Sequence, residues 1–577
     1  MRLGSRLRRR LGLALVATPV ALQLVAVALL GVNTILGDEI YYVDFIRDVH
    51  EGRGWWHWLA LQHNEHRVVP MKLVMAPLAL LTHWDTRAEM YVSGVLAALT
   101  VLGLWHLYRR LGGEDLLFFA PAAWLVCSFA QYENMLWGMM MCLYFTVAGA
   151  VWALALLAGG GPLAFAGAVL CALTAAFSLV NGALIWPLGL ALLLLQRRWR
   201  GAAVWSAIGG MALVAYFHGF QRPPAPHAEP PLFALSTVFE AGRFGVTLLG
   251  GALAGGSNAW SKVIGLLLAA GAAWLAVRWV RSPQHLRRDA PVAALLAFGA
   301  LSCGMLAVGR LAFDEPALQP RYVVYSTLVV LPLYLLLARA AERGGPALRI
   351  RLVFAAALTL LLPGLAAANL DGLESALRWR QGELQQKLAL QTFDQQPPEA
   401  LGAISLDPRL SEKAAYLRQH RLGPFADAMD MMLVGRWREG VPADEILPGR
   451  AVEQTLVCPV NELLDLGVPF ITYARSNRSH VTLSLWADGH NLAAREVSAA
   501  TLEDNGWVTL SPRLKRCRGK HLLVRIESAD ASAGDALTVW TYPRYYDGEV
   551  TQPGNLRITG RSLGLTLNAL SAGLISE

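Results

Sequence analysis

The stretch LGLALVATPVALQLVAVALLGVNTIL, residues 11–36, runs for about 26 residues without a charged side chain. An apolar helix of about 20 residues is long enough to cross the hydrocarbon core of a bilayer. The run is followed at once by the acidic stretch GDEIYYVDFIRD, residues 37–48, and soon afterwards by HNEHR, residues 63–67. Carboxylates beside a membrane are costly unless they are used, so we expect the chemistry of this protein here.

The composition divides the chain into a membrane part and a soluble part. The 577 residues are 55% hydrophobic and only 16% charged, whereas soluble domains carry about 25% charged residues. Long apolar runs fill residues 11–370, and residues 371–577 have an ordinary soluble composition. We therefore predict an all-α polytopic membrane bundle at 1–370, a helical or mixed linker region at 371–450 and a β-sandwich of jelly-roll type at 451–577.

The arginine clusters between the apolar runs predict the topology. Cytoplasmic loops are enriched in Lys and Arg, so clusters such as Arg109-Arg110 and Arg197-Arg198 are placed inside. The basic stretch at residues 2–10 is then cytoplasmic too, and the net charge of +8 does not indicate nucleic-acid binding. About eleven spans follow, near 11–36, 90–108, 115–131, 135–157, 162–180, 182–195, 201–218, 260–280, 291–309, 322–340 and 352–370.

Two apolar stretches are too short for spans in this scheme. Val68–Thr82 and Phe244–Gly256 are predicted to be interfacial or re-entrant, because crossing would put later arginines on the wrong side. With the N-terminus inside, the first loop (37–89) and the C-terminal domain are predicted to be periplasmic. A disulfide between Cys458 and Cys517, the two cysteines of the soluble part, would suit that compartment.

Local patterns predict elements in the soluble part. Alternation of apolar and polar residues favours strands at 481–486, 522–526 and 536–541, with turns at 487–489 and 504–506. The stretch 374–390 has the periodicity of an amphipathic helix.

Polar residues gather at the predicted outer ends of the spans, whereas the inner ends carry mainly arginines. A carboxylate such as Asp38 can take the proton of an acceptor hydroxyl. Arginines such as Arg310 and Arg321 can hold a phosphate and neutralise charge on a leaving group. The outer set also includes Asp48, His57, Ser178, Asn181, His227, Asp314 and Glu315. A base and a cationic clamp suit the transfer of a sugar from a lipid phosphate carrier.

Residues 11–370 resemble the GT-C superfamily of integral-membrane glycosyltransferases, in its bacterial branch related to protein mannosyltransferase-like and aminoarabinose transferase-like enzymes. The resemblance lies in Asp38-Glu39 directly after the first span, in the large first loop with a surface helix starting at Val69-Pro70, and in Arg310…Arg321-Tyr322 before a late span. It implies that Asp38 is the catalytic base, with Glu39 or Asp44 as alternatives, and that the donor is a polyprenyl-phosphate sugar. The HNEHR stretch departs from the superfamily's general pattern and resembles a bacterial subset of it.

Substrate or phosphate contacts are expected from a wider set: His63, Asn64, Glu65, His66, Arg67, Lys72, Glu133, Asn134, Arg310, Arg321 and Tyr322. Structural alternatives stand beside these roles. Asp44 and Asp48 are four residues apart and share a helix face with Arg47 nearby, as in a salt-bridged surface. Arg67 and Lys72 could instead bind anionic headgroups, and Arg310 and Arg321 could form a local salt-bridge network. A divalent ion at His63, Glu65 and His66 is the alternative to hydrogen bonding with sugar or phosphate, which we prefer, so no metal and no cofactor are expected.

The predicted function is that of an inverting glycosyltransferase at the outer face of the bacterial inner membrane. Its partners would be membrane lipids, a polyprenyl-phosphate-linked sugar, and a glycan, lipid or protein acceptor. One alternative is a transporter or flippase of lipid-linked glycans, which needs no base and should carry charges along a path through the membrane. The other is a non-enzymatic scaffold for envelope assembly, with the β-domain as its working part.

Overall fold

The computed structural model describes residues 5–222, 234–313, 315–344, 348–391, 393, 401–402, 404–426, 429–433, 440–458, 462–517, 519–543, 549–555 and 561–570. The chain divides into two compact units that interleave along the sequence. The first unit comprises Met1–Gly31, Asp48–Leu78 and Thr86–Trp379. The second comprises Val32–Arg47, Ala79–Asp85 and Arg380–Glu577, so the acidic segment after the first apolar helix is grouped with the C-terminal residues.

The described residues up to Gln391 form helices joined by turns and loops. The helices are α1 (Ser5–Leu30), α2 (Val43–His50), α3 (His57–Ala60), α4 (Val69–Thr82), α5 (Thr86–Leu111), α6 (Leu116–Val126), α7 (Tyr132–Leu136), α8 (Met141–Gly159), α9 (Pro162–Ser178), α10 (Ile185–Leu195), α11 (Trp199–Phe217), α12 (Leu235–Gly250), α13 (Asn258–Arg281), α14 (Pro283–Gly309), α15 (Val323–Arg343) and α16 (Leu348–Gln391). Short 3-10 turns join several of them: η1 (Gly37–Tyr42), η2 (Phe129–Gln131), η3 (Gly138–Met140), η4 (Val180–Leu184), η5 (Gly251–Leu253) and η6 (Pro320–Tyr322).

Within the described residues, nine helical segments are long and apolar enough to cross a bilayer. They correspond to nine of the eleven predicted spans. The other two predicted spans are shorter apolar helical segments, Pro162–Ser178 and Val180–Leu195. The stretch Val68–Thr82, predicted to be interfacial, contains the 14-residue helix α4.

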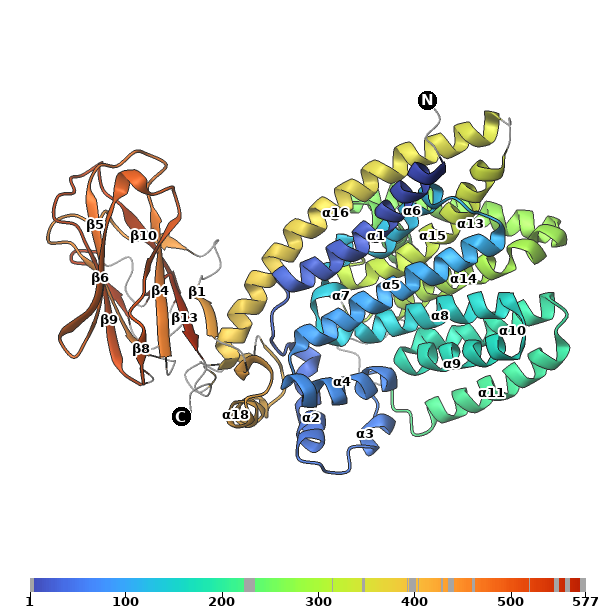
Figure 1. The fold of residues 1–577 in the computed structure, drawn as a ribbon, viewed down its shortest axis with the longest axis horizontal. Helices are drawn as coiled ribbons and strands as arrows, with labels where there is room; N and C mark the ends of the chain where they lie inside the picture. The colour runs from blue at the N-terminus through green and yellow to red at the C-terminus, as the bar shows by residue number, and fades with distance from the viewer. Residues whose placement is uncertain are drawn as a thin grey trace. The chain divides into compact units, whose positions relative to one another are not determined.

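The transmembrane bundle is built around α8. Helix α8 packs against both α5 and α9, α12 packs against α13, and α14 packs against α15. Figure 1 shows α5, α8 and α9 running side by side. The apolar window of α8 is 83% buried inside the protein, whereas those of α1, α13 and α16 are mostly uncovered. Outward leucines and valines on these three helices are the side chains expected to face lipid, which is as apolar as they are.

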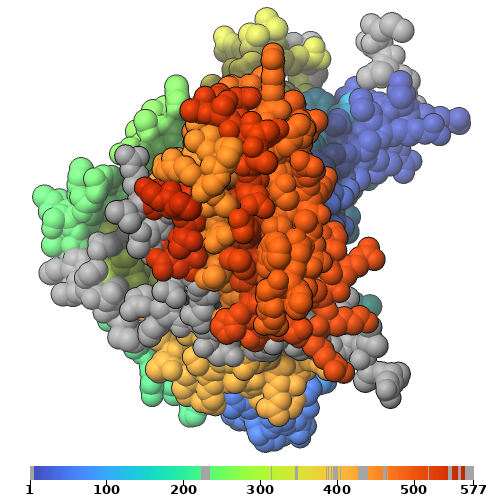
Figure 2. All heavy atoms as spheres, turned by 90° about the vertical axis from the view of Figure 1, so that its left-hand side faces the viewer, coloured from blue at the N-terminus to red at the C-terminus, as the bar shows by residue number. Residues whose placement is uncertain are grey.

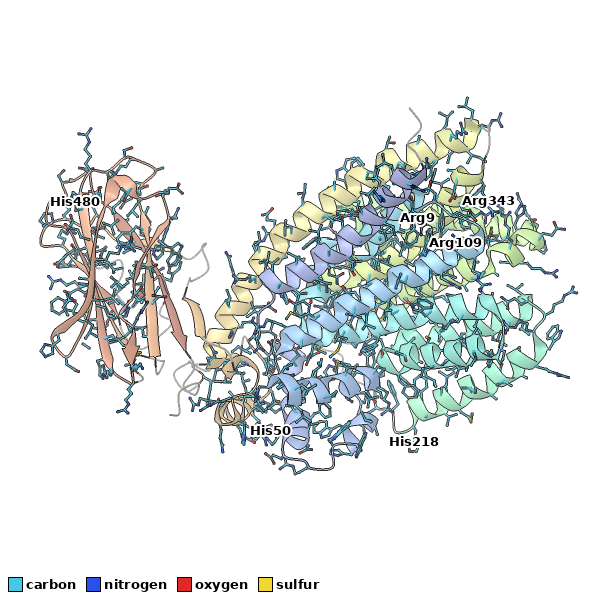
Figure 3. The ribbon with its side chains drawn as sticks, in the orientation of Figure 1. Arg9, His50, Arg109, His218, Arg343 and His480 are labelled. Atoms are coloured by element: carbon cyan, nitrogen blue, oxygen red, sulfur yellow. A yellow bond between two sulfur atoms is a disulfide. The ribbon has the colours of Figure 1, made fainter. Side chains whose placement is uncertain are left out.

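Basic residues mark one end of the bundle. Figure 3 shows Arg9, Arg109 and Arg343 gathered at this end, with His218 at the opposite end. Polar contacts fix the arginine end: Arg343 Nε donates to Gly112 O at 2.8 Å, and Tyr108 Oη donates to Glu342 at 2.7 Å. These three arginines belong to the clusters that the positive-inside pattern places together on one side of the membrane.

The C-terminal residues form a β-sandwich, preceded by α18 (Leu410–His420) and η8 (Gly423–Phe425). The described strands are β1 (Met429–Leu433), β2 (Val441–Pro442), β3 (Val452–Val457), β4 (Glu462–Ile471), β5 (His480–Ala487), β6 (His490–Ser498), β7 (Gly506–Leu510), β8 (Leu514–Lys515), β9 (His521–Glu527), β10 (Thr538–Pro543), β11 (Val550–Thr551), β12 (Arg561–Leu563) and β13 (Leu565–Leu570). One sheet has the order β1-β13-β4-β10-β12, with β2 on β10 and both β7 and β8 on β4, and the other has the order β11-β3-β9-β5-β6.

Alternating side chains explain this sandwich. In β9 the residues Leu522, Val524 and Ile526 are buried while their neighbours are more exposed, and they join Phe470 and Val539 in one core. The three predicted strands are confirmed as β5, β9 and β10. Figure 2 shows one face of the β-sandwich domain, in orange and red.

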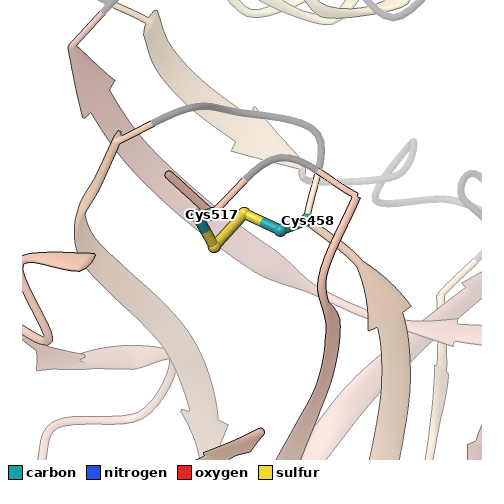
Figure 4. The surroundings of a disulfide bond; sticks show 2 residues. All are labelled: Cys458 and Cys517. Atoms are coloured by element: carbon teal, nitrogen blue, oxygen red, sulfur yellow. A yellow bond between two sulfur atoms is a disulfide. The ribbon is translucent and has the colours of Figure 1, made fainter. Parts of the chain in front are cut away.

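A disulfide joins Cys458, after β3, to Cys517, after β8 (Figure 4). Both sulfur-bearing side chains are buried in the sandwich core, and the Cα atoms are 5.8 Å apart, an ordinary separation for a disulfide. The link closes a loop of 59 residues between two parts of the domain.

Candidate functional site

The acidic segment forms the turn η1 and the start of α2. Glu39 is only 1% exposed, and its Oε2 accepts a hydrogen bond from Leu36 N at 3.2 Å. Asp38 is partly exposed. The buried carboxylate therefore supports the backbone of its own turn, whereas Asp38 is the one of the pair with access to solvent.

Asp44 lies among cations. Arg409 donates to its Oδ2, Lys413 Nζ is 3.2 Å from the same oxygen, and Arg47 Nη1 is 3.7 Å from Oδ1. These contacts are those of the salt-bridged alternative raised from the sequence.

Two arginines and three glutamates form a cluster in the bundle unit, called here the arginine–glutamate cluster: Arg310, Arg321, Glu65, Glu133 and Glu315. Arg321 Nη1 is 2.7 Å from Glu133 Oε1 and its Nη2 is 3.3 Å from Glu315 Oε2. Arg310 is held more loosely, at 3.6 Å from Glu65 and 3.9 Å from Glu315. Neither of these last distances is that of a hydrogen bond.

Aromatic rings hold the two guanidinium groups in place. Arg310 Cζ lies 5.1 Å from the ring centre of Phe313, and Arg321 Cζ lies 5.2 Å from that of Tyr322. Tyr322 Oη donates to Glu315. Asn134, fully buried beside Glu133, donates to Arg321 O at 3.2 Å. These contacts join the predicted residues of α7 and η6, which are far apart in sequence.

The HNEHR stretch is a tight turn rather than a helix. His63 N donates to His66 O at 2.7 Å and His66 N to His63 O at 2.8 Å. Asn64 and Val68 have φ of 48° and 46°, and a β-branched residue in this region is strained. The turn places Glu65 beside Arg310, so it contributes one carboxylate to the arginine–glutamate cluster.

Arg67 and Lys72 are buried and hold this turn through backbone carbonyls. Arg67 donates to Tyr216 O at 2.8 Å and to Ala60 O and His218 O, both at 2.6 Å. Lys72 Nζ donates to the carbonyls of Trp58, Leu61 and Arg67 at 2.7, 2.7 and 3.1 Å. Burial and the nearby Arg67 charge lower the pKa of Lys72 to about 7. Because their donors are used in this way, we leave both residues out of the phosphate-binding set proposed below.

His66 is fixed by its surroundings. Its Nδ1 accepts the backbone N–H of Val180 at 3.2 Å, so the proton of the neutral ring is on Nε2, which lies 3.6 Å from Glu65. In the described part of the chain, no three His, Cys, Asp or Glu side chains lie together as metal ligands.

The cluster lies at the end of the bundle that carries His218. Tyr216 Oη donates to Glu65 O at 2.7 Å, and Arg67 binds the carbonyl of His218, which Figure 3 shows far from Arg9 and Arg109. The predicted residues thus fall into two sets: Asp38, Glu39 and Asp44 in the C-terminal unit, and the binding residues in the bundle unit. His227 and Asp314 lie outside the described residues.

Sequence reasoning missed the basic residues of α18 that surround Asp44. A signal for one of them was present, because Lys413 occupies an apolar-stripe position of α18 together with Leu410, Ala414 and Leu417. A lysine at such a position must find buried partners.

Comparison of the sequence with protein-family profiles and with curated protein sequences finds no match. Comparison with solved structures aligns 93% of this chain with 64% of the arabinosyltransferase EmbB from Mycobacterium smegmatis, at 11% sequence identity and a TM-score of 0.34. The chain therefore spans somewhat less than two thirds of that protein, and a likeness this distant supports no conclusion about activity.

Proposed function

We propose that this protein is a membrane-embedded glycosyltransferase that moves a sugar from a polyprenyl-phosphate carrier to an extracytoplasmic glycan, lipid or protein. The observation that supports this most is the loosely paired Arg310 within the arginine–glutamate cluster. Its guanidinium is held by Phe313 but makes no short ion pair among the described residues. A phosphate oxygen would therefore gain charge-assisted hydrogen bonds there without displacing a strong partner.

The chemistry assigns a different task to each set of residues. The acceptor oxygen attacks the anomeric carbon of the sugar while the bond from that carbon to the carrier phosphate oxygen breaks. Asp38 takes the proton of the acceptor hydroxyl. Arg310, steadied by the Glu315–Arg321–Tyr322 contacts, stabilises the negative charge on the departing polyprenyl phosphate. One displacement inverts the configuration of the sugar.

Asp38→Asn in the purified full-length protein tests the assignment. It removes the base but keeps the size of the side chain, so folding should be retained and release of polyprenyl phosphate should fall about 100-fold or more. The matched control is Asp488→Asn, an exposed position with φ of 48° in the turn after β5, where asparagine is well tolerated.

The outcome separates the proposal from its rivals. Full transfer by the Asp38→Asn variant would exclude Asp38 as the base. Movement of a lipid-linked sugar across proteoliposomes by the wild-type protein, with no transfer to any acceptor, would favour the transporter.

A further inference from the structure

Helix α18 comes more than 350 residues after the acidic segment, yet it lies beside the start of α2 (Figure 1). Arg409, which precedes its first turn, and Lys413 both contact Asp44 Oδ2. Two cations of one helix therefore share a single carboxylate of the acidic segment. All of these residues belong to the same compact unit.

Lys413 is the central residue of this contact. Its side chain is 1% exposed, and a buried ammonium group needs an acceptor for each of its three N–H donors. Three acceptors surround Nζ: Ile40 O at 3.0 Å, Asp407 Oδ2 at 2.7 Å and Asp44 Oδ2 at 3.2 Å. The carbonyl of Ile40 follows Asp38-Glu39 directly, so Lys413 fixes the backbone that carries the predicted base.

Further bonds hold both ends of the same segment. Upstream, Asn33 Nδ2 donates to Gly423 O at 2.8 Å, and Gly37 N donates to Ile404 O at 3.1 Å. Downstream, Arg47 lies 3.3 Å from Glu412 Oε1, and its Cζ is 4.6 Å from the ring centre of Tyr416.

The contacts on α18 share one helix face. Residues 409, 412, 413 and 416 follow the i, i+3, i+4, i+7 spacing that places side chains on one side of a helix. That side meets the acidic segment, while Leu410, Ala414 and Leu417 are buried. The helix thus presents a polar surface matched to residues 40–47.

We propose that α18 positions the catalytic segment and that Lys413 is a positioning residue for Asp38. The proposal rests on the glycosyltransferase function proposed above. Catalytic groups must be held within about 0.5 Å of their productive geometry, and a displacement of about 1 Å can lower the rate about 100-fold. Loss of the Lys413 contacts should therefore affect the chemical step more than the binding of the lipid donor.

The test is Lys413→Met in the full chain, with Lys520→Met as the matched control at an exposed position of the same unit. We expect kcat for sugar transfer to fall about 10- to 100-fold while KM for the polyprenyl-phosphate sugar stays within about twofold. Amide hydrogen exchange of residues 37–47 should accelerate in the variant and not in the control. A purely structural role would not give this separation of kcat from KM.

Each result decides the question. An unchanged kcat overturns the positioning role, and unchanged exchange at residues 37–47 overturns the claim that α18 holds the segment. If Lys413→Met does not fold, Arg409→Gln serves instead, because this side chain is largely exposed; it should lower kcat about two- to fivefold, and no change would count against the proposal.

The test also separates the two proposals. A wild-type protein that transfers no sugar from any polyprenyl-phosphate donor would refute the proposed function, and the exchange measurement would still decide whether α18 holds the segment.

Discussion

Arg310→Gln is the substitution that best separates donor binding from folding. The guanidinium is 3.6 Å from Glu65 and 3.9 Å from Glu315, and its side chain is 23% exposed. Loose, partly exposed pairs of this kind contribute about 0–1 kcal/mol to stability. We therefore expect the free energy of unfolding to change by less than about 1 kcal/mol.

The effect on the reaction should be much larger. A hydrogen bond to a charged group contributes about 1.5–3 kcal/mol, and each 1.36 kcal/mol corresponds to a factor of ten in rate. The kcat/KM for a polyprenyl-phosphate sugar should then fall about 10- to 150-fold. Activity on a donor is measured by release of polyprenyl phosphate, and stability by the apparent melting temperature in the same detergent.

Arg321→Gln should behave differently. Its partner Glu133 is 5% exposed and lies 2.7 Å away, and breaking a buried pair costs about 3–5 kcal/mol. Because Arg321 itself is 28% exposed, solvent screening reduces this cost, and we expect a loss of about 2–3 kcal/mol, at or just below the lower end of that range. This variant should lose stability together with activity.

The matched control for both is Arg243→Gln, since Arg243 also pairs with a glutamate, Glu240, but at an exposed position. It should leave kcat/KM and the melting temperature nearly unchanged. An Arg310→Gln protein with wild-type kcat/KM would refute the phosphate role, and one that melts far below wild type would refute the weak pairing.

Three further outcomes follow from the structure. Gly423 has φ of +57°, and a Cβ there would lie 2.8 Å from Ile35 Cδ1, so Gly423→Ala should destabilise the C-terminal unit by about 1 kcal/mol or more. Adding Ile35→Val, which removes Cδ1, should restore part of the lost melting temperature. A double variant that melts no higher than Gly423→Ala would contradict the contact. Reduction of Cys458–Cys517 opens a 59-residue loop and should destabilise the β-sandwich by up to about 4 kcal/mol. The reduced protein should then be proteolysed faster than the oxidised protein in this domain, and equal rates would contradict the prediction. The hydrogen bond with Asp530 raises the pKa of His480. The stability from this pair is therefore complete below the unfolded histidine pKa of about 6.5 and is lost as pH rises through the folded pKa. Asp530→Asn should lower the His480 pKa measured by histidine-selective NMR, and an unchanged pKa would exclude Asp530 as the cause of the raised value.

Much of the fold follows from local patterns. In lipid, apolar runs of about 20 residues can pair all their backbone polar groups only as helices. Apolar residues at every second position from 522 to 526 favour a strand with one buried face. These signals come from neighbouring residues, so no knowledge of distant contacts was needed. Val180–Leu195 illustrates the limit, because an apolar run does not show that its first turn is a separate 3-10 segment.

The candidate site could be predicted only as a collection of residue types. Glu133 and Arg321 are 188 residues apart, and no periodicity connects them. The local sequence also does not show which side chains are buried. Arg67 and Lys72 were expected to contact substrate or phosphate, and in the structure they donate to backbone carbonyls.

By itself the sequence determined that residues 11–370 are a helical membrane bundle, that β-strands follow, and that carboxylates gather beside the first apolar helix. Hydropathy and charge depend only on residue type, so they can be read along the chain. Only the tertiary structure decided that Glu39 supports its own turn, that Arg310 is loosely paired and Arg321 tightly paired, and that α18 surrounds Asp44. Those properties depend on which distant side chains come within a few ångströms of one another, where Coulomb and hydrogen-bond energies become large.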